Sequence, residues 1–228
     1  ILLSGDMAYM MPQYTETFMS ALGGYILKFF PIFLLGALFG QLMVDSGAAS
    51  SISNSIMNKL GHQRAILTVV LACGVLTYGG VSLFVVAFAI YPIAKSMFQA
   101  ANIPKRLIPG AIALGSFTFT MTALPGSPSI QNAIPIPFFG TNVFAAPGIG
   151  IISGLIMFGL GSIWLQSRAN KARSNGEGYG VDTEEGEKLE DGVTSKGEMP
   201  VFLAFLPLLL VIGVNALFTY IIFPGMDF

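Results

Sequence analysis

Long stretches without charge constrain this chain more than any other feature of its sequence. Residues 107–167 contain no Asp, Glu, Lys or Arg, and residues 65–94 are uncharged as well. Charged residues make up 10% of the 228 residues, whereas a soluble domain carries about 25%. The uncharged runs reach the roughly 20 residues that a membrane-spanning helix needs, and exceed the ten or so of a barrel strand. We therefore predict an all-α, polytopic helical membrane protein.

The composition also excludes several classes of site and partner. Cys73 is the only cysteine, so neither an intrachain disulfide nor a thiolate metal site can form, and His62 is likewise alone. Most of the twelve acidic residues fall between 177 and 198, and no basic patch for a nucleic acid is present. We expect no metal, no cofactor and no nucleic-acid partner.

Five segments follow one another between residues 24 and 166, which we predict to form one structural repeat. They are a span at 24–44, an amphipathic interfacial helix at 49–60, a hairpin at 65–94, an interrupted span at 107–142 and a span at 143–165. Residues 1–23 are predicted to be the end of a preceding span and an external connection, so we expect a fragment of a longer protein. Residues 167–199 have the acidic, Gly- and Ser-rich composition of a disordered cytoplasmic linker. Residues 200–228 hold a further span, which could begin a second repeat.

The first interruption is "TYGGVS", residues 77–82, in the middle of the uncharged run 65–94. One straight helix over this run would be about 45 Å long, beyond a hydrocarbon core of about 30 Å. Two glycines permit a turn, and hence a re-entrant hairpin; the alternative is one long tilted helix. We favour the hairpin because it returns the flanking basic residues to one side, as the positive-inside rule prefers: Lys59, Arg64, Lys95, Lys105 and Arg106. A third basic cluster, Arg168, Lys171 and Arg173, then falls on the same side.

The second interruption is "TALPGSPSIQN", residues 122–132. Pro125 biases Leu124 away from helical geometry, while Ser129 can cap a new helix after the break. A broken helix exposes carbonyls that attract cations and amides that attract anions, which suits a small carboxylate. The alternative is a plain loop at the outer surface. Neutral groups that could hold a carboxylate or hydroxyl here are Thr120, Thr122, Ser127, Ser129, Gln131 and Asn132.

Several strings in these segments are similar to those of a known family. "FPIFLLGALFGQLMVDSGAA", "LTYGGVSLFVVAFAIYPIA", "IPKRLIPGAIALGSFTFTMTALPGSPSIQNAIP" and "FFGT" resemble the gluconate permease family, within the ion transporter superfamily. The resemblance covers most of residues 24–166. It implies a secondary carrier of gluconate or a similar small hydroxycarboxylate, generally coupled to protons, in the inner membrane. It also implies inverted repeats, each with a re-entrant hairpin and an interrupted helix, so this chain would supply one repeat.

The resemblance maps the hairpin tip onto Thr77 to Ser82 and the interruption onto Pro125 to Asn132. With the neutral groups named above, the predicted substrate-binding residues are Thr77, Tyr78, Gly79, Gly80, Ser82, Thr120, Thr122, Pro125, Gly126, Ser127, Ser129, Gln131 and Asn132. The expected partners are a small organic anion, the lipid bilayer and the second repeat of the full-length chain, with a homodimer left open.

Two other functions compete with the carrier. An ion channel or exchanger could use the same hairpin and broken helix, but a pore needs continuous polar lining, whereas polar residues here concentrate at two interruptions. A membrane enzyme would need catalytic groups, and residues 29–44, 65–94 and 107–167 contain no acidic or basic side chain. Coupling could use protons, or sodium held by the exposed carbonyls of the break.

Overall fold

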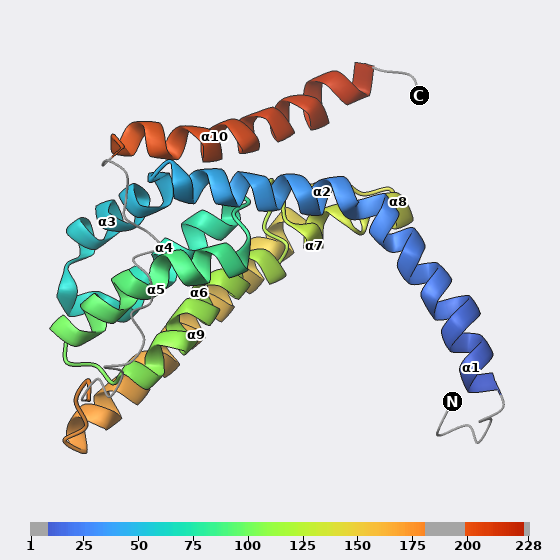
Figure 1. The fold of residues 1–228 in the computed structure, drawn as a ribbon. Helices are drawn as coiled ribbons and strands as arrows, with labels where there is room; N and C mark the ends of the chain where they lie inside the picture. The colour runs from blue at the N-terminus through green and yellow to red at the C-terminus, as the bar shows by residue number, and fades with distance from the viewer. Residues whose placement is uncertain (1–8, 181–198, 226–228) are drawn as a thin grey trace. The chain divides into compact units, whose positions relative to one another are not determined.

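The computed structural model describes residues 9–180 and 199–225, and within these ranges the chain is helical with no strand. Four of the described helices are long and apolar enough to cross a membrane: Met10–Asp45, Leu83–Ala100, Pro147–Ser174 and Val201–Gly225 (Figure 1). The prediction of an all-α, polytopic membrane protein is therefore confirmed. The chain divides into two compact units, Ile1–Gly36 and Ala37–Phe228.

The first unit is helical through all of its described residues. It consists of α1 (Met10–Pro12), the π-helical turn η2 (Gln13–Phe18) and the first part of α2 (Met19–Asp45). The connection that we predicted before residue 24 is instead helical from Met10 onward. Pro12 does not prevent this, because a proline in the first turn removes an N–H that has no helical partner there.

The core of the second unit is the packing of α4 (Ala65–Tyr78) against α6 (Ile108–Met121). The two helices approach closely at Gly115, where a Cβ would collide with the carbonyl oxygen of Val70 and with the side chain of Cys73. Within lipid, the hydrophobic effect does not drive helices together. Small residues let the backbones approach closely, so that van der Waals packing can hold the helices together instead. α9 (Pro147–Ser174) packs against α6 and, less extensively, against α4.

The amphipathic segment predicted at 49–60 forms α3 (Ala48–Leu60). It buries Ile52 completely and packs against α4, α5 (Leu83–Ala100) and α10 (Val201–Leu217). Its apolar face therefore contributes to the core of the second unit, while its position at a membrane interface stays a prediction.

The run 65–94 bends where the two glycines lie. α4 ends in a Schellman motif, in which Gly80 N donates to Thr77 O and Val81 N donates to Leu76 O. Gly80 has φ +101°, a conformation that residues with a Cβ rarely adopt. α5 then begins at Leu83 and runs to Ala100, six residues beyond the predicted end, because nothing in "KSMFQA" breaks a helix. The helical hairpin is thus present, and its depth in the membrane stays a prediction.

The second interruption is also present, but the chain beyond it differs from the prediction. After the turn η4 (Lys105–Leu107), α6 ends at Met121 rather than Leu124. Beyond the break, only the single turns α7 (Ile130–Ala133) and α8 (Ile136–Phe139) form. The predicted second half-helix is absent, because Pro135 and Pro137 lack the amide hydrogens that would propagate it. Gly140, in the left-handed conformation, then ends α8.

α9 begins at Pro147 rather than residue 143 and extends nine residues beyond the predicted end at 165, through the third basic cluster. The predicted linker from residue 167 is therefore helical up to Ser174, and its part at 181–198 lies outside the described residues. The further span predicted at 200–228 corresponds to α10, which continues into η5 (Phe218–Ile222) and η6 (Phe223–Gly225).

Candidate substrate site

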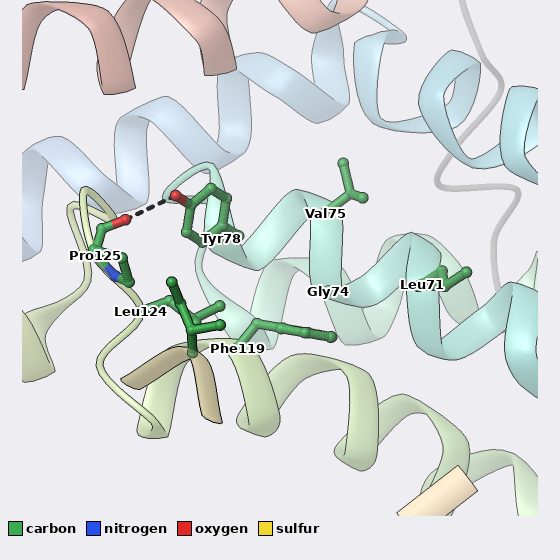
Figure 2. Close-up of a pocket in the computed structure, with 8 residues that line it drawn as sticks. Leu71, Gly74, Val75, Tyr78, Phe119, Leu124 and Pro125 are labelled. Carbon is green, nitrogen blue, oxygen red and sulfur yellow. Dashed lines mark hydrogen bonds between the residues drawn. The ribbon is translucent and has the colours of Figure 1, made fainter. Parts of the chain in front are cut away.

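The two interruptions lie side by side, joined by reciprocal hydrogen bonds. Tyr78 at the hairpin tip donates its phenolic hydrogen to the carbonyl oxygen of Pro125, with an oxygen to oxygen distance of 2.8 Å (Figure 2). Ser127 donates its hydroxyl hydrogen to the carbonyl oxygen of Tyr78 at 3.1 Å. Each segment thus offers a side chain to the backbone of the other. Carbonyls that a turn or a break would leave unpaired are satisfied in this way.

The tip and the break also contact each other at Gly80. A Cβ on this residue would lie 2.7 Å from Cγ of Pro128, a separation that real Cβ atoms do not tolerate. The same glycine therefore serves the turn and the contact, which fixes the hairpin tip against the break.

Asn132 binds the break from within. Its amide nitrogen Nδ2 lies 2.8 Å from Leu124 O, 2.9 Å from Ser127 O and 3.4 Å from Val143 O. All three neighbours are acceptors, so the NH₂ side of the amide, rather than its oxygen, must face them. We expected this amide to donate to a substrate, but its donors are directed at the protein's own backbone.

The threonines of the predicted site also donate inward. Thr77, Thr120 and Thr122 each donate a hydroxyl hydrogen to the carbonyl four residues earlier, at 2.8, 2.9 and 2.6 Å. Such back-bonding is the ordinary behaviour of threonine within a helix. Their hydroxyl oxygens could still accept a hydrogen bond, but not donate a second one.

Two serine hydroxyls remain available as donors. Ser129 is 8% exposed, and its Oγ has no hydrogen-bond partner within the described residues. Its side chain does not cap α7 as predicted; its backbone amide instead donates to Ser127 Oγ at 3.3 Å. Ser82 stands at the N-cap of α5 and its side chain makes no capping bond. A buried hydroxyl without a partner is costly, and within the described residues Thr68, Ser116, Thr118 and Ser162 share this property outside the predicted set. Ser129 is the one member of the predicted set that has it.

The other predicted residues have different surroundings. Gly79 lies against Leu208 of α10, where a Cβ would collide with its side chain, and Gly126 donates its backbone N–H to Val143 O at 2.8 Å. Gln131 directs its amide at the sulfur of Met121, 3.2 Å away. The structure thus brings the hairpin tip and the break together, while the predicted set as a whole stays a prediction.

A cavity of about 350 Å³ opens beside the Tyr78 and Pro125 bond, and it is apolar. Tyr78 is its one polar side chain, and the hydroxyl of that residue is already bonded to Pro125 (Figure 2). A hydroxycarboxylate would find no free donor there, so this cavity is not the predicted substrate site. Its lining is Leu71, Gly74, Val75, Tyr78, Phe119, Leu124, Pro125 and Ile151.

Metal ligands do not gather anywhere in the parts of the chain that the structure describes: no three His, Cys, Asp or Glu residues lie close enough to hold an ion. The carbonyls of the break are also largely engaged. Those of Leu124, Pro125 and Ser127 each accept a hydrogen bond from a side chain. Any cation at the break would have to displace these donors.

A second fastening, which the sequence did not predict, lies at the basic end of the second unit. Arg106, ahead of α6, forms a bidentate ion pair with Glu177, which follows α9, at nitrogen to oxygen distances of 2.6 and 2.7 Å. Nearby, Tyr179 N donates to Asn102 Oδ1 at 2.9 Å. The Arg106 guanidinium lowers the pKa of the Glu177 carboxyl through these hydrogen bonds. We call residues 102–107 and 177–179 the clamp.

The clamp places the three basic clusters at one end of the second unit. α4 begins after Arg64 and α5 ends after Lys95, and the short turn between these helices returns the chain to the same end. The ion pair adds the end of α9, which carries the third cluster. This arrangement agrees with what the hairpin was predicted to achieve, although which side of the membrane this end faces stays a prediction.

Comparison with known proteins gives a consistent result. The sequence profile described as "GntP family permease" matches residues 4–223. An uncharacterized transporter of Bacillus subtilis (strain 168), YxjC, is 49% identical over 232 residues, which cover 98% of this chain and 49% of that protein. An uncharacterized transporter of Haemophilus influenzae is 35% identical over 127 residues, which cover 55% of this chain and 30% of that protein. This chain spans about half the length of the Bacillus relative. No solved structure matches.

Proposed function

This chain belongs to the GntP family of permeases, and from that premise we propose that it carries a small hydroxycarboxylate of the gluconate type by secondary active transport. Protons are the proposed coupling ion, and a cell inner membrane the proposed location. The family and the relatives named above are those of transporters, not of enzymes. Because the match covers about half of the Bacillus relative, the transporting unit that we propose is the full-length protein.

The observation that carries this proposal is the pair of reciprocal hydrogen bonds between the hairpin tip and the break. A carrier holds its substrate at one place between interrupted helices, whereas a channel needs a continuous polar path. Two interruptions of helices, whose bonded residues Tyr78 and Pro125 are 47 positions apart in sequence, meet here. Each stabilises the backbone of the other.

Within this region, Ser82 and Ser129 are the proposed donors to the substrate carboxylate. Ser129 is buried and its hydroxyl is unpaired among the described residues, while Ser82 precedes the 18-residue α5, whose first amides lack intrahelical partners. Neutral hydroxyls and amides can hold an anion without a buried countercharge. The engagement of the Leu124, Pro125 and Ser127 carbonyls leaves few ligands for sodium at the break.

Uptake by the full-length gene product in proteoliposomes tests the proposal. A panel of radiolabelled hydroxy acids, including gluconate, is offered under an imposed proton gradient, an imposed sodium gradient or neither. We expect uptake of at least one small hydroxycarboxylate that the proton gradient drives and the sodium gradient does not. Uptake of inorganic ions alone would support the channel or exchanger instead.

A matched pair of variants connects the activity to the site. Ser129→Ala should reduce affinity by about tenfold or more, since a hydrogen bond to a charged group contributes roughly 1.5 to 3 kcal/mol. Ser174→Ala, at the exposed end of α9, should transport as the unchanged protein does. Equal affinity in both variants would remove Ser129 from the site.

A further inference from the structure

We infer that Asn132 is a positioning residue whose amide fills a cage of three backbone carbonyl oxygens and so holds the broken helix open in its binding shape. The inference rests on the proposed transport function only for its activity measurement, since the cage itself is a feature of the fold. In this inference Asn132 shapes the site, whereas Ser82 and Ser129 are the proposed hydrogen-bond donors to the substrate.

The cage draws its oxygens from three separate segments. Leu124 O lies just after the end of α6, Ser127 O lies in the middle of the break, and Val143 O lies on the chain leading to α9. Val143 O also accepts from Gly126 N at 2.8 Å. The single nitrogen of Asn132, on α7, therefore connects the first part of the break, its middle and the segment after it.

Electrostatics explain why a donor must stand at this point. Three carbonyl oxygens that converge on one position repel one another unless a donor stands between them. Leu124 O also accepts from Ser127 N at 3.4 Å, and Val143 O accepts from Gly126 N at 2.8 Å. It is therefore chiefly Ser127 O that would lose its donor if Asn132 were replaced. Asn132 is 8% exposed, so water has little access to the cage. The two shortest distances, 2.8 and 2.9 Å, are those of ordinary N–H···O hydrogen bonds.

Convergent carbonyls are also the ligands by which proteins hold monovalent cations. Here a neutral amide that belongs to the chain occupies the position that such a cation would take. The break therefore keeps its shape without a bound ion, and the substrate meets a preformed site. A variant that lacks the amide should keep this shape only when an external hydrogen-bond donor of similar size occupies the position.

Ammonium is that external donor, because its N–H groups can point at the three oxygens once Asn132→Ala has emptied the position. The test uses the full-length protein in substrate counterflow, which needs no imposed proton gradient, with equal ammonium chloride on both sides of the vesicle. We expect Asn132→Ala to lower the maximal rate by about tenfold, because fewer molecules hold the break in its binding shape, and to change KM much less. Ammonium should restore the rate of this variant, whereas tetramethylammonium, which has the same charge and no N–H, should not.

Asn132→Asp is the matched variant, since it keeps the shape of the side chain and replaces the donor by a carboxylate oxygen. Its maximal rate at neutral pH should be as low as that of Asn132→Ala. A tenfold rise in KM at an unchanged maximal rate in Asn132→Ala would make Asn132 a substrate ligand and overturn the inference. Ordinary kinetics in both variants would overturn it as well.

Thermal unfolding separates this inference from the proposed function, because it needs no substrate. Ammonium should raise the melting temperature of Asn132→Ala and leave that of the unchanged protein where it was. If the unchanged protein moves no hydroxy acid but this shift appears, the cage stands and the proposed function fails. If Asn132→Ala does not fold, Asn132→Ser, which keeps one donor, serves in its place; no shift with ammonium in a folded variant would contradict the cage.

Discussion

Two contacts in the second unit join distant parts of the chain through different chemistry. One is the contact between the hairpin tip and the break, here called the centre, and the other is the clamp. At the centre, Tyr78, Ser127 and Asn132 donate from neutral groups to backbone carbonyls. At the clamp, Arg106 and Glu177 form an ion pair whose side chains are 60% and 41% exposed. A charged side chain within a membrane carries a large desolvation cost, even when it is neutralised or paired. An exposed ion pair loses little hydration, and salt screens its attraction. The stability that the centre contributes should therefore not depend on salt or mild acid, whereas the stability that the clamp contributes should fall with both.

The largest loss of stability is expected from a substitution at Gly80. Gly80→Ala places a Cβ against Pro128 at a residue with φ +101°. Backbone strain and overpacking together should destabilise the protein by about 2 to 4 kcal/mol, whatever the salt concentration. Unfolding of the purified protein in a denaturing detergent gives the value. Gly159→Ala is the control, since a Cβ there meets nothing within 4 Å, and a stable Gly80→Ala would show that the tip and the break are not in contact.

A smaller loss is expected when the central hydrogen bond alone is removed. Tyr78→Phe leaves the carbonyl of Pro125 without its donor and should cost about 1 to 3 kcal/mol, again independently of salt. Tyr91→Phe provides the comparison, because the Tyr91 hydroxyl has no hydrogen bond to any described residue. Identical unfolding curves for the two variants would mean that the Tyr78 bond contributes nothing.

The clamp should give a still smaller effect that depends on conditions. Glu177→Gln should lower the melting temperature slightly in low salt, and the difference from the unchanged protein should vanish in high salt. Because Arg106 lowers the pKa of Glu177, the stabilisation is present above the ordinary carboxyl pKa and is lost as the pH falls through the lowered value. Melting curves across salt and acid pH measure both trends. Adding Arg106→Gln to Glu177→Gln should cost little more, and additive losses would show that the two side chains do not interact.

The smallest effect is expected for the acidic segment beyond the clamp. Its composition cannot bury a core, so deleting residues 181–190 from the full-length protein should leave uptake nearly unchanged. Deleting residues 177–190 also removes Glu177 and Tyr179, and should lower the melting temperature by the small amount expected for Glu177→Gln. A large loss of uptake from the shorter deletion, at normal expression, would indicate a docking or regulatory role for that segment.

Both interruptions could be predicted from the sequence because each is caused by glycine or proline residues within it. Gly79 and Gly80 act on their own turn, and Pro125 acts on Leu124, so the hairpin and the break could both be found from neighbouring residues. We expected Ser129 to cap a new helix after the break, but Pro135 and Pro137 limit this part of the chain to single turns. The partners of Asn132 and the Arg106 to Glu177 pair join residues from different segments. Nothing in the local sequence identifies them, and they emerge only when the helices are packed.

Protection of Ser129 by substrate tests whether the substrate occupies the meeting point of hairpin and break. In the full-length protein with Cys73 and any other native cysteine replaced by Ala, the cysteine introduced by Ser129→Cys is allowed to react with a small thiol reagent, with Ser174→Cys as the control. At ten times the dissociation constant, about one site in eleven is free, so substrate should slow the reaction at 129 by about tenfold. It should leave the reaction at 174 unchanged. An unprotected cysteine at 129, in a protein that still transports the same substrate, would show that the substrate binds elsewhere.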